Sequence, residues 1–246
     1  MTLIAAMRCD TGVVVAADSK ATEGSTGDVL QDQSFITQKL FSLGPKIVWG
    51  SSGSGGVAQR LRDAFDVDYK SSSGKYVKAA SEIQGHCRNI IAKIMKVEVA
   101  PIPIDIRLAI QMGSFVPNKF LFAGFDTKTW IHELCWDGQS SSYNSVGFHA
   151  IGSGALAALT CYKILEHHDF AGAPLETIRT VLYRIVDVCI KSNSGGLGPP
   201  IKMWEITAGG GHELTATELR ATEDTVRVWE SQERDCLSGL PSPGAD

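Results

Sequence analysis

The order in which strand-like and helix-like segments follow one another constrains the fold of this chain more than any other feature. Strand patterns come first, then two helical patterns, then strands again, then two more helices. The strands are predicted at Leu3–Met7, Val13–Ala17, Lys39–Leu43, Lys46–Trp49, Arg107–Met112, Phe120–Gly124, Trp130–Cys135 and Ile201–Ile206. The helices are predicted at Val57–Phe65, Tyr76–Met95, Ala155–His167 and Leu175–Lys191. This order indicates an α+β sandwich of antiparallel sheets with helices layered outside, rather than alternating βαβ units.

Size and charge narrow the class of protein further. The 246 residues are enough to bury a large core, and the net charge of −4 argues against a general nucleic-acid binder. Because no apolar run approaches a membrane span, we expect a soluble, cytoplasmic protein without a membrane partner. Six cysteines without a C-x-x-C pair predict reduced core thiols and no metal site. Residues 1–206 are predicted to form the domain, and residues 207–246 a polar tail with one short helix near Thr222–Arg234.

Thr2 is the first candidate for chemistry, because it directly follows the initiator methionine. Once Met1 is removed, Thr2 carries a hydroxyl nucleophile and a free α-amine on one residue. An α-amine has a pKa of roughly 7.7–8.0, which suits a general base near neutral pH. Threonine follows methionine in many proteins of other kinds, so the position alone is weak evidence for catalysis.

Four further segments occur in a fixed order after Thr2. They are Asp18-Ser-Lys-Ala-Thr22, the pair Lys39-Leu40 ahead of a hairpin, the glycine- and serine-rich stretch 51–56, and Gly152-Ser-Gly154. Together they resemble motifs of the proteasome β-subunit family, which are N-terminal threonine hydrolases. The resemblance covers roughly residues 2–206. It implies a four-layer αββα sandwich of the Ntn-hydrolase type and a threonine-type endopeptidase that acts through an acyl-enzyme.

The resemblance also implies a role for each matching residue. Thr2 would be the nucleophile, Lys39 the cation that eases proton removal from its hydroxyl, and Asp18 the carboxylate that orients Lys39. The backbone N–H of Gly53 would form the oxyanion hole, and Ser153 would hydrogen-bond the α-amine. Residues expected to bind the peptide substrate are Thr22, Ser51 and Gly55, and those expected to support the site are Ser194 and Gly195.

One position departs from the family pattern. Lys191 stands three residues before Ser194, where proteasome β subunits carry an aspartate. The surrounding DVCIKSN resembles instead the proteolytic subunit of the bacterial two-component ATP-dependent protease. These resemblances imply polypeptide substrates, a homo-oligomeric ring, a candidate ATP-dependent unfoldase partner and no cofactor. The two early helices are expected to pack between subunits, with the tail outside that contact.

Other interpretations stay open at this point. The same fold could be non-catalytic, or transpeptidase-like, with the acyl-enzyme resolved by an amine instead of water. Gly53, Gly55 and Ala58 also form a G-x-G-x-x-A pattern between a strand and a helix, which could cradle the phosphates of a dinucleotide. A second helix follows where a dinucleotide fold would need a βαβ unit. Asp18 and Lys39 could form an ordinary surface ion pair.

Overall fold

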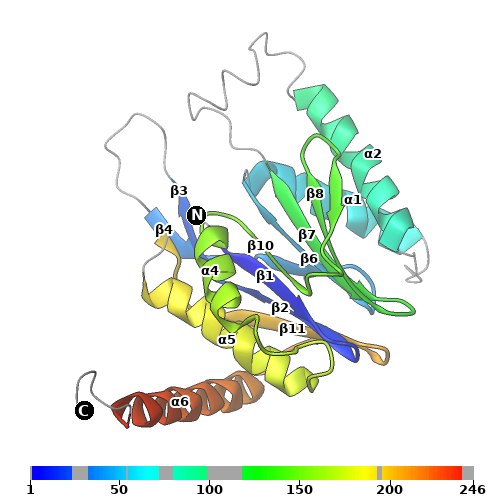
Figure 1. The fold of residues 1–246 in the computed structure, drawn as a ribbon. Coiled ribbons are helices and arrows are strands. Elements are labelled where there is room, and N and C mark those ends of the chain that lie inside the picture. Colours follow the sequence, from blue (N-terminus) through cyan, green and yellow to red (C-terminus); the bar gives the residue numbers. More distant parts are fainter. Residues whose placement is uncertain are drawn as a thin grey trace.

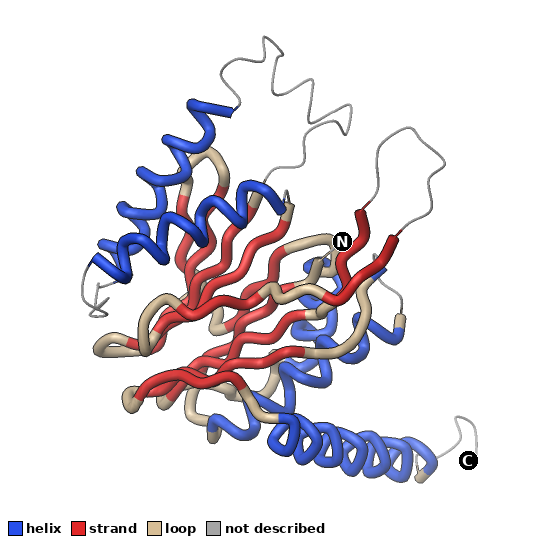
Figure 2. Tube along the Cα trace, turned by 180° about the vertical axis from the view of Figure 1, so that it is seen from behind, coloured by secondary structure: helices blue, strands red, loops and turns tan. Residues whose placement is uncertain are grey.

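Two five-stranded sheets stack face to face, and helices cover the outer face of each (Figures 1 and 2). This computed structural model describes residues 2–23, 33–53, 55–71, 80–98, 118–192 and 196–239. Its strands are β1 (Ile4–Arg8), β2 (Gly12–Ala17), β3 (Lys20–Glu23), β4 (Gln33–Ile36), β5 (Leu40–Ser42), β6 (Ile47–Ser52), β7 (Lys119–Phe125), β8 (Thr129–Cys135), β9 (Ser140–Ser142), β10 (Phe148–Ile151), β11 (Lys202–Thr207) and β12 (Gly210–Glu213). Its helices are α1 (Gly55–Ser71), α2 (Ala80–Glu98), α4 (Ala155–Leu165), α5 (Leu175–Lys191) and α6 (Ala216–Ser238). The predicted α+β class and four-layer sandwich are confirmed.

The strand pairings define the two sheets. The first sheet has the order β10-β1-β2-β11-β12, and the second has the order β5-β6-β7-β8-β9. Neighbouring strands are antiparallel in both sheets, and a separate ribbon pairs β3 with β4. Helices α4 and α5 pack on the first sheet, while α1 and α2 pack on the second. Among the described helices, none is both long and apolar enough to cross a lipid bilayer.

Strand β1 shows how the sequence specifies these layers. Leu3, Ala5 and Met7 pack in the core beneath α4 and α5, whereas Ile4 and Ala6 pack in the core between the two sheets. Successive side chains of a strand point to opposite faces, so a strand in this position must be apolar at every residue. The uninterrupted apolar run at the start of the chain therefore encodes a central strand that is buried on both faces.

The C-terminal region differs from the predicted polar tail. The predicted boundary at residue 206 falls inside β11, and β12 pairs with β11, so the first sheet continues past that boundary. The following helix α6 has 23 residues, more than the predicted segment Thr222–Arg234. A capping box of Thr215 and Glu218 begins it. The predicted strand Arg107–Met112 lies outside the described residues, and β10 was not predicted.

Helix α6 packs along the outside of α5 (Figure 1). Val226 is 2% exposed, although its helix is otherwise mostly exposed. The guanidinium of Arg184 on α5 lies 3.9 Å from the ring centre of Trp229 and forms an ion pair with Glu233. A narrow stripe of side chains therefore holds a largely polar helix against the domain, which composition alone does not reveal.

This packing yields a test with a matched control on the same helix. Val226→Ala is expected to lower the free energy of unfolding by about 2 kcal/mol, because it leaves a cavity in a buried contact. Val228→Ala removes the same atoms from a side chain that is 58% exposed, and is expected to change stability by less than about 0.5 kcal/mol. Urea unfolding of both variants measures the difference. Equal losses would show that α6 is not docked on α5.

Candidate active site

The ends of strands from both sheets meet at one edge of the sandwich. In the first sheet, β1 is antiparallel to β2 and to β10, which brings Thr2, Asp18 and Ser153 together. In the second sheet, Lys39 precedes β5 and Gly53 follows β6, its antiparallel neighbour. Figure 1 shows the N-terminus beside α4, which begins at Ala155, just past Ser153. The topology thus collects residues that are up to 151 positions apart in the chain.

Asp18 is the buried centre of this region, with 1% exposure. Its Oδ1 accepts a hydrogen bond from the backbone N–H of Leu3 at 2.8 Å and another from Nζ of Lys39 at 2.7 Å. Its Oδ2 accepts a bond from the N–H of Gly198 at 3.3 Å. Burying a carboxylate is costly unless donors replace water, and here three donors do so. The pair of Asp18 and Lys39 is therefore a buried interaction and not the surface ion pair considered from the sequence.

Lys39 is 8% exposed and also donates to the backbone carbonyl of Lys20 at 2.6 Å. Burial lowers the pKa of Lys39, and the hydrogen bond and attraction from Asp18 offset only part of this effect. The ammonium therefore loses its proton more readily than that of a lysine in water. It shares Oδ1 of Asp18 with the N–H of Leu3, which places Lys39 against the backbone next to Thr2.

The backbone of Thr2 is held from the other side by the turn after β10. Its N–H donates to Oγ of Ser153 at 3.2 Å, and its carbonyl accepts from the N–H of Gly154 at 3.3 Å. Gly152 has φ +96°, and a Cβ placed on it would lie 2.1 Å from the carbonyl oxygen of Thr2. Only glycine permits this approach. The sequence motif around Ser153 did not show that Gly152 contacts Thr2.

Gly53 lies between β6 and α1, with φ +110°. A Cβ on it would lie 2.9 Å from Cα of Asn118, a residue that is 2% exposed and was not predicted from the sequence. Because β6 is antiparallel to both of its neighbours, the strand–helix unit at Gly53 is not the βαβ unit of a dinucleotide site. That alternative interpretation was wrong.

The remaining predicted residues are spread around this edge. Ser51 is half-buried on β6, and Gly55 is the exposed first residue of α1. Thr22 lies in β3, opposite Ser34 of β4. Ser194 and Gly195 lie outside the described residues. Lys191 ends α5, where its exposed side chain pairs with Asp187 at 2.6 Å. The roles assigned to these residues stay predictions.

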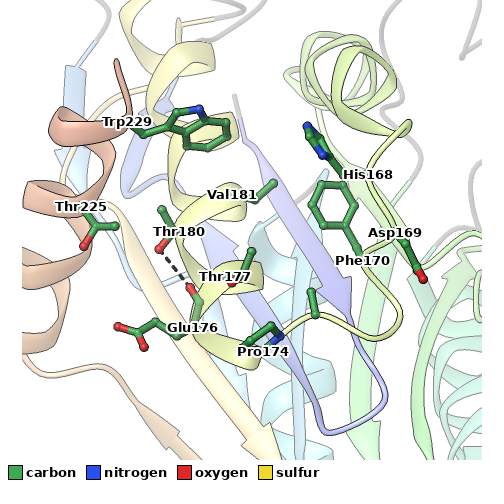
Figure 3. Close-up of a pocket in the computed structure, with 11 residues that line it drawn as sticks. His168, Asp169, Phe170, Pro174, Glu176, Thr177, Thr180, Val181, Thr225 and Trp229 are labelled. Atoms are coloured by element: carbon green, nitrogen blue, oxygen red, sulfur yellow. Dashed lines mark hydrogen bonds between the residues drawn. The ribbon is translucent and has the colours of Figure 1, made fainter. Parts of the chain in front are cut away.

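No metal site emerges from the described ranges, where no three His, Cys, Asp or Glu side chains are placed to hold an ion. A cavity of about 650 Å³ lies between α5, α6 and the loop that joins α4 to α5 (Figure 3). Its walls include Phe170, Val181 and Trp229, and the hydroxyl of Thr180 donates to the carbonyl of Glu176 there. None of the predicted site residues that the structure describes lines this cavity.

Comparison with known proteins points to one family. A family model described as "Proteasome subunit" matches residues 2–104. The chain is 25% identical over 235 residues to a proteasome subunit beta of Streptosporangium roseum, covering 92% of this chain and 75% of that protein. It is also 25% identical over 238 residues to a proteasome subunit beta of Stackebrandtia nassauensis, covering 92% of this chain and 77% of that protein.

Solved structures share the fold. Anbu (ancestral beta-subunit) from Yersinia bercovieri has a TM-score of 0.69 at 14% identity, covering 99% of this chain and 100% of that chain. A structure described as the helical assembly of the Anbu complex from Pseudomonas aeruginosa has a TM-score of 0.70 at 17% identity, covering 99% and 98% of the two chains. With the sequence matches, these structures confirm the predicted resemblance to proteasome β subunits.

The contact between Gly152 and Thr2 gives a test of the site geometry that needs no activity. Gly152→Ala and Gly147→Ala both place alanine at positive φ, +96° and +75°, at a cost of about 1–2 kcal/mol each. Only at position 152 would the new Cβ clash with the backbone, since the nearest atoms to a Cβ at position 147 are 3.9 Å away, which is an ordinary contact distance. Gly152→Ala is therefore expected to be less stable than Gly147→Ala by at least about 2 kcal/mol in urea unfolding. Similar losses would contradict the close approach of Thr2 to Gly152.

Proposed function

We propose, from the premise that this chain is a relative of the proteasome β subunits, that it is a threonine-type endopeptidase with Thr2 as its nucleophile. The observation that carries the proposal is the shared carboxylate of Asp18. One oxygen of this group binds both Lys39 and the backbone that follows Thr2. This arrangement supports a fixed cation beside a hydroxyl nucleophile, as the proposed reaction requires.

The proposed reaction begins after Met1 is removed, when Thr2 has a free α-amine beside the hydroxyl of Ser153. Oγ1 of Thr2 attacks the scissile carbonyl carbon while the hydroxyl proton passes to the α-amine. The carbonyl oxygen becomes an oxyanion that accepts a hydrogen bond from the N–H of Gly53. The C–N bond then breaks, the amine product leaves with the proton, and an acyl ester stays on Thr2. Water hydrolyses this ester and restores the hydroxyl.

Lys39 stabilises this sequence of steps by its charge. Its ammonium is buried and held by Asp18 and by the carbonyl of Lys20. In a partly dry site, a positive charge near the hydroxyl lowers the cost of the developing alkoxide more than it would in water. In this proposal Thr22, Ser51 and Gly55 bind the peptide, which adds as a strand at the open edge.

Substitutions at the centre of the site test the proposal. Thr2→Ala is expected to abolish both cleavage of fluorogenic peptides and covalent labelling by a peptide epoxyketone, because it removes the attacking oxygen. Lys39→Met is expected to lower kcat at least about 100-fold, since nucleophile and activator act as one unit. Asp18→Asn keeps a hydrogen-bond acceptor and is expected to be milder. Intact mass of each sample shows whether the chain begins at Thr2.

Two controls make the result specific. Thr2→Ser keeps a hydroxyl and an α-amine and is expected to keep labelling. Lys202→Met removes a half-exposed lysine that pairs with Glu213 and is expected to leave kcat within about twofold. An active wild-type protein that retains Met1 would exclude the α-amine of Thr2 as the base. Products joined to an added amine would identify a transpeptidase instead of a hydrolase.

The subunits are also proposed to form a homo-oligomer. The Anbu complex from Pseudomonas aeruginosa is described as a helical assembly. In this chain, α4 presents three large apolar side chains to solvent, Leu156 at 77%, Leu159 at 41% and Ile164 at 69% exposure. Such a group on one helix face is typical of a contact surface. Head-to-tail contacts generate either the predicted ring or an open helix, depending on whether the rotation closes. An ATP-dependent unfoldase partner stays a prediction.

A charge on this helix face should separate the subunits. Leu156→Glu is expected to yield smaller species than the wild type in light scattering at micromolar concentration, because it buries a charge in the contact. Val228→Glu introduces the same charge at an exposed apolar residue of α6 and is expected to leave the assembly intact. A monomeric wild-type protein would refute the assembly. Unchanged assembly of Leu156→Glu would show that α4 is not the contact.

A further inference from the structure

A buried carboxylate lies between the two sheets, away from the groups assigned to the reaction. Glu133 of β8 is 5% exposed. It lies on the face of β8 that also carries Ile131, a member of the apolar core between the sheets. Its Oε2 lies 2.5 Å from Nε2 of His149 on β10, the edge strand of the opposite sheet. This contact is a polar link through a mostly apolar layer.

Three donors satisfy Glu133. Besides His149, Nζ of Lys119 lies 3.0 Å from Oε1, and Sγ of Cys135 donates to the same oxygen at 3.2 Å. Burial alone would raise the pKa of Glu133, but the hydrogen bonds from these groups outweigh it and hold the pKa at about 2. The ring of Tyr143 stacks on His149 with a centroid separation of 3.5 Å. Glu133 is therefore a fixed anion, and its partner His149 is itself packed against an aromatic ring.

Both ends of this network are connected along the chain to segments of the site. His149 belongs to the strand that leads into the turn of Ser153, whose hydroxyl binds the N–H of Thr2. Lys119 follows Asn118, against which Gly53 packs. The link thus joins the segment that holds the nucleophile to the segment that carries the predicted oxyanion donor, and these segments belong to different sheets.

We propose that Glu133, with His149 and Lys119, is a positioning network that fixes the distance between Ser153 and Gly53 across Thr2. This inference rests on the proposed function, because the distance matters only if both groups act on one peptide bond. Buried ion pairs often contribute little net stability compared with apolar side chains of similar size. Hydrogen bonds are directional, so they fix the relative position of two segments more narrowly than an apolar contact would. A fixed geometry is therefore the benefit that we assign to this buried network.

The other end of the same strand provides a matched control. Thr129 of β8 is 2% exposed, and its Oγ1 also links the sheets, by donating to the carbonyl of Cys9 at 2.9 Å and accepting from Nε of Arg8 at 2.7 Å. Arg8 ends β1, whereas Thr2 precedes it. Thr129 is therefore a buried polar link of similar kind at the end of the sandwich away from the site.

The experiment compares Glu133→Gln and Lys119→Met with Thr129→Val in the full-length protein. Glu133→Gln is expected to lower kcat for a fluorogenic peptide at least about tenfold with KM within about twofold, because small displacements of reacting groups slow the chemical step. Lys119→Met removes a half-exposed donor, so it should fold readily and show a smaller loss in the same direction. Thr129→Val is expected to lose thermal stability but to keep kcat within about twofold.

Amide hydrogen exchange supplies a readout that needs no activity. Exchange at Gly53 and at Gly152–Gly154 is expected to be faster in Glu133→Gln and in Lys119→Met than in the wild type, and unchanged in Thr129→Val. An inactive wild-type protein would refute the proposed function, while exchange would still decide whether the network positions these segments. The inference would be overturned if Thr129→Val changed kcat or the exchange rates as much as the two network variants do. It would also be overturned if neither network variant changed kcat or exchange.

Discussion

The buried carboxylate of Asp18 is the interaction on which the arrangement of this edge depends. It binds Leu3 directly ahead of β1, Lys39 ahead of β5 and Gly198 in the loop after α5. Removing one donor would leave part of a buried charge unsatisfied, at a cost of several kcal/mol. Three segments that are far apart in the chain are therefore fixed relative to one another. The position of Thr2 is a direct consequence, because its neighbour Leu3 is one of the three donors.

The layered fold explains why the edge of a sandwich suits such a centre. Between the sheets the core is mostly apolar, and β1 supplies side chains to two apolar layers at once. Polar groups enter where strands end, because backbone N–H groups there have no partner strand and can turn to a side chain. The N–H of Leu3 and that of Gly198 are used in this way.

The sequence predicted the parts whose patterns repeat along the chain. Strands β1 and β2 were predicted because burial on both faces gives an uninterrupted apolar run, and helix α5 because burial on one face gives a helical period. Strand β10 has four residues, and His149 interrupts its apolar pattern for a reason visible only in the opposite sheet. Helix α6 depends on a few buried side chains such as Val226. Its polar composition therefore suggested a tail.

The candidate site also has parts that the sequence predicted and parts that it did not. Its side chains were identified through the resemblance, whereas the backbone donors and acceptors around them were not. The carbonyl of Lys20 and the N–H of Gly198 bind Lys39 and Asp18, but every residue carries such groups, so no pattern distinguishes these two. The close approach of Gly152 to Thr2 likewise depends on the pairing of β10 with β1. The local sequence shows that a glycine is present, but it does not show which other segment of the chain packs closely against that glycine.

The two buried charge clusters differ in a way that matches their proposed roles. At Asp18 the charge of the cation is destabilised, because burial lowers the pKa of Lys39 despite the carboxylate beside it. At Glu133 the hydrogen bonds from the donors outweigh the effect of burial, and the pKa of about 2 keeps the carboxylate ionised throughout the neutral range. A group that assists proton transfer must respond to a change of charge nearby, whereas a group that only holds geometry must not. Lys39 and Glu133 satisfy these opposite requirements because burial outweighs the bond from Asp18 at Lys39, whereas the hydrogen bonds outweigh burial at Glu133.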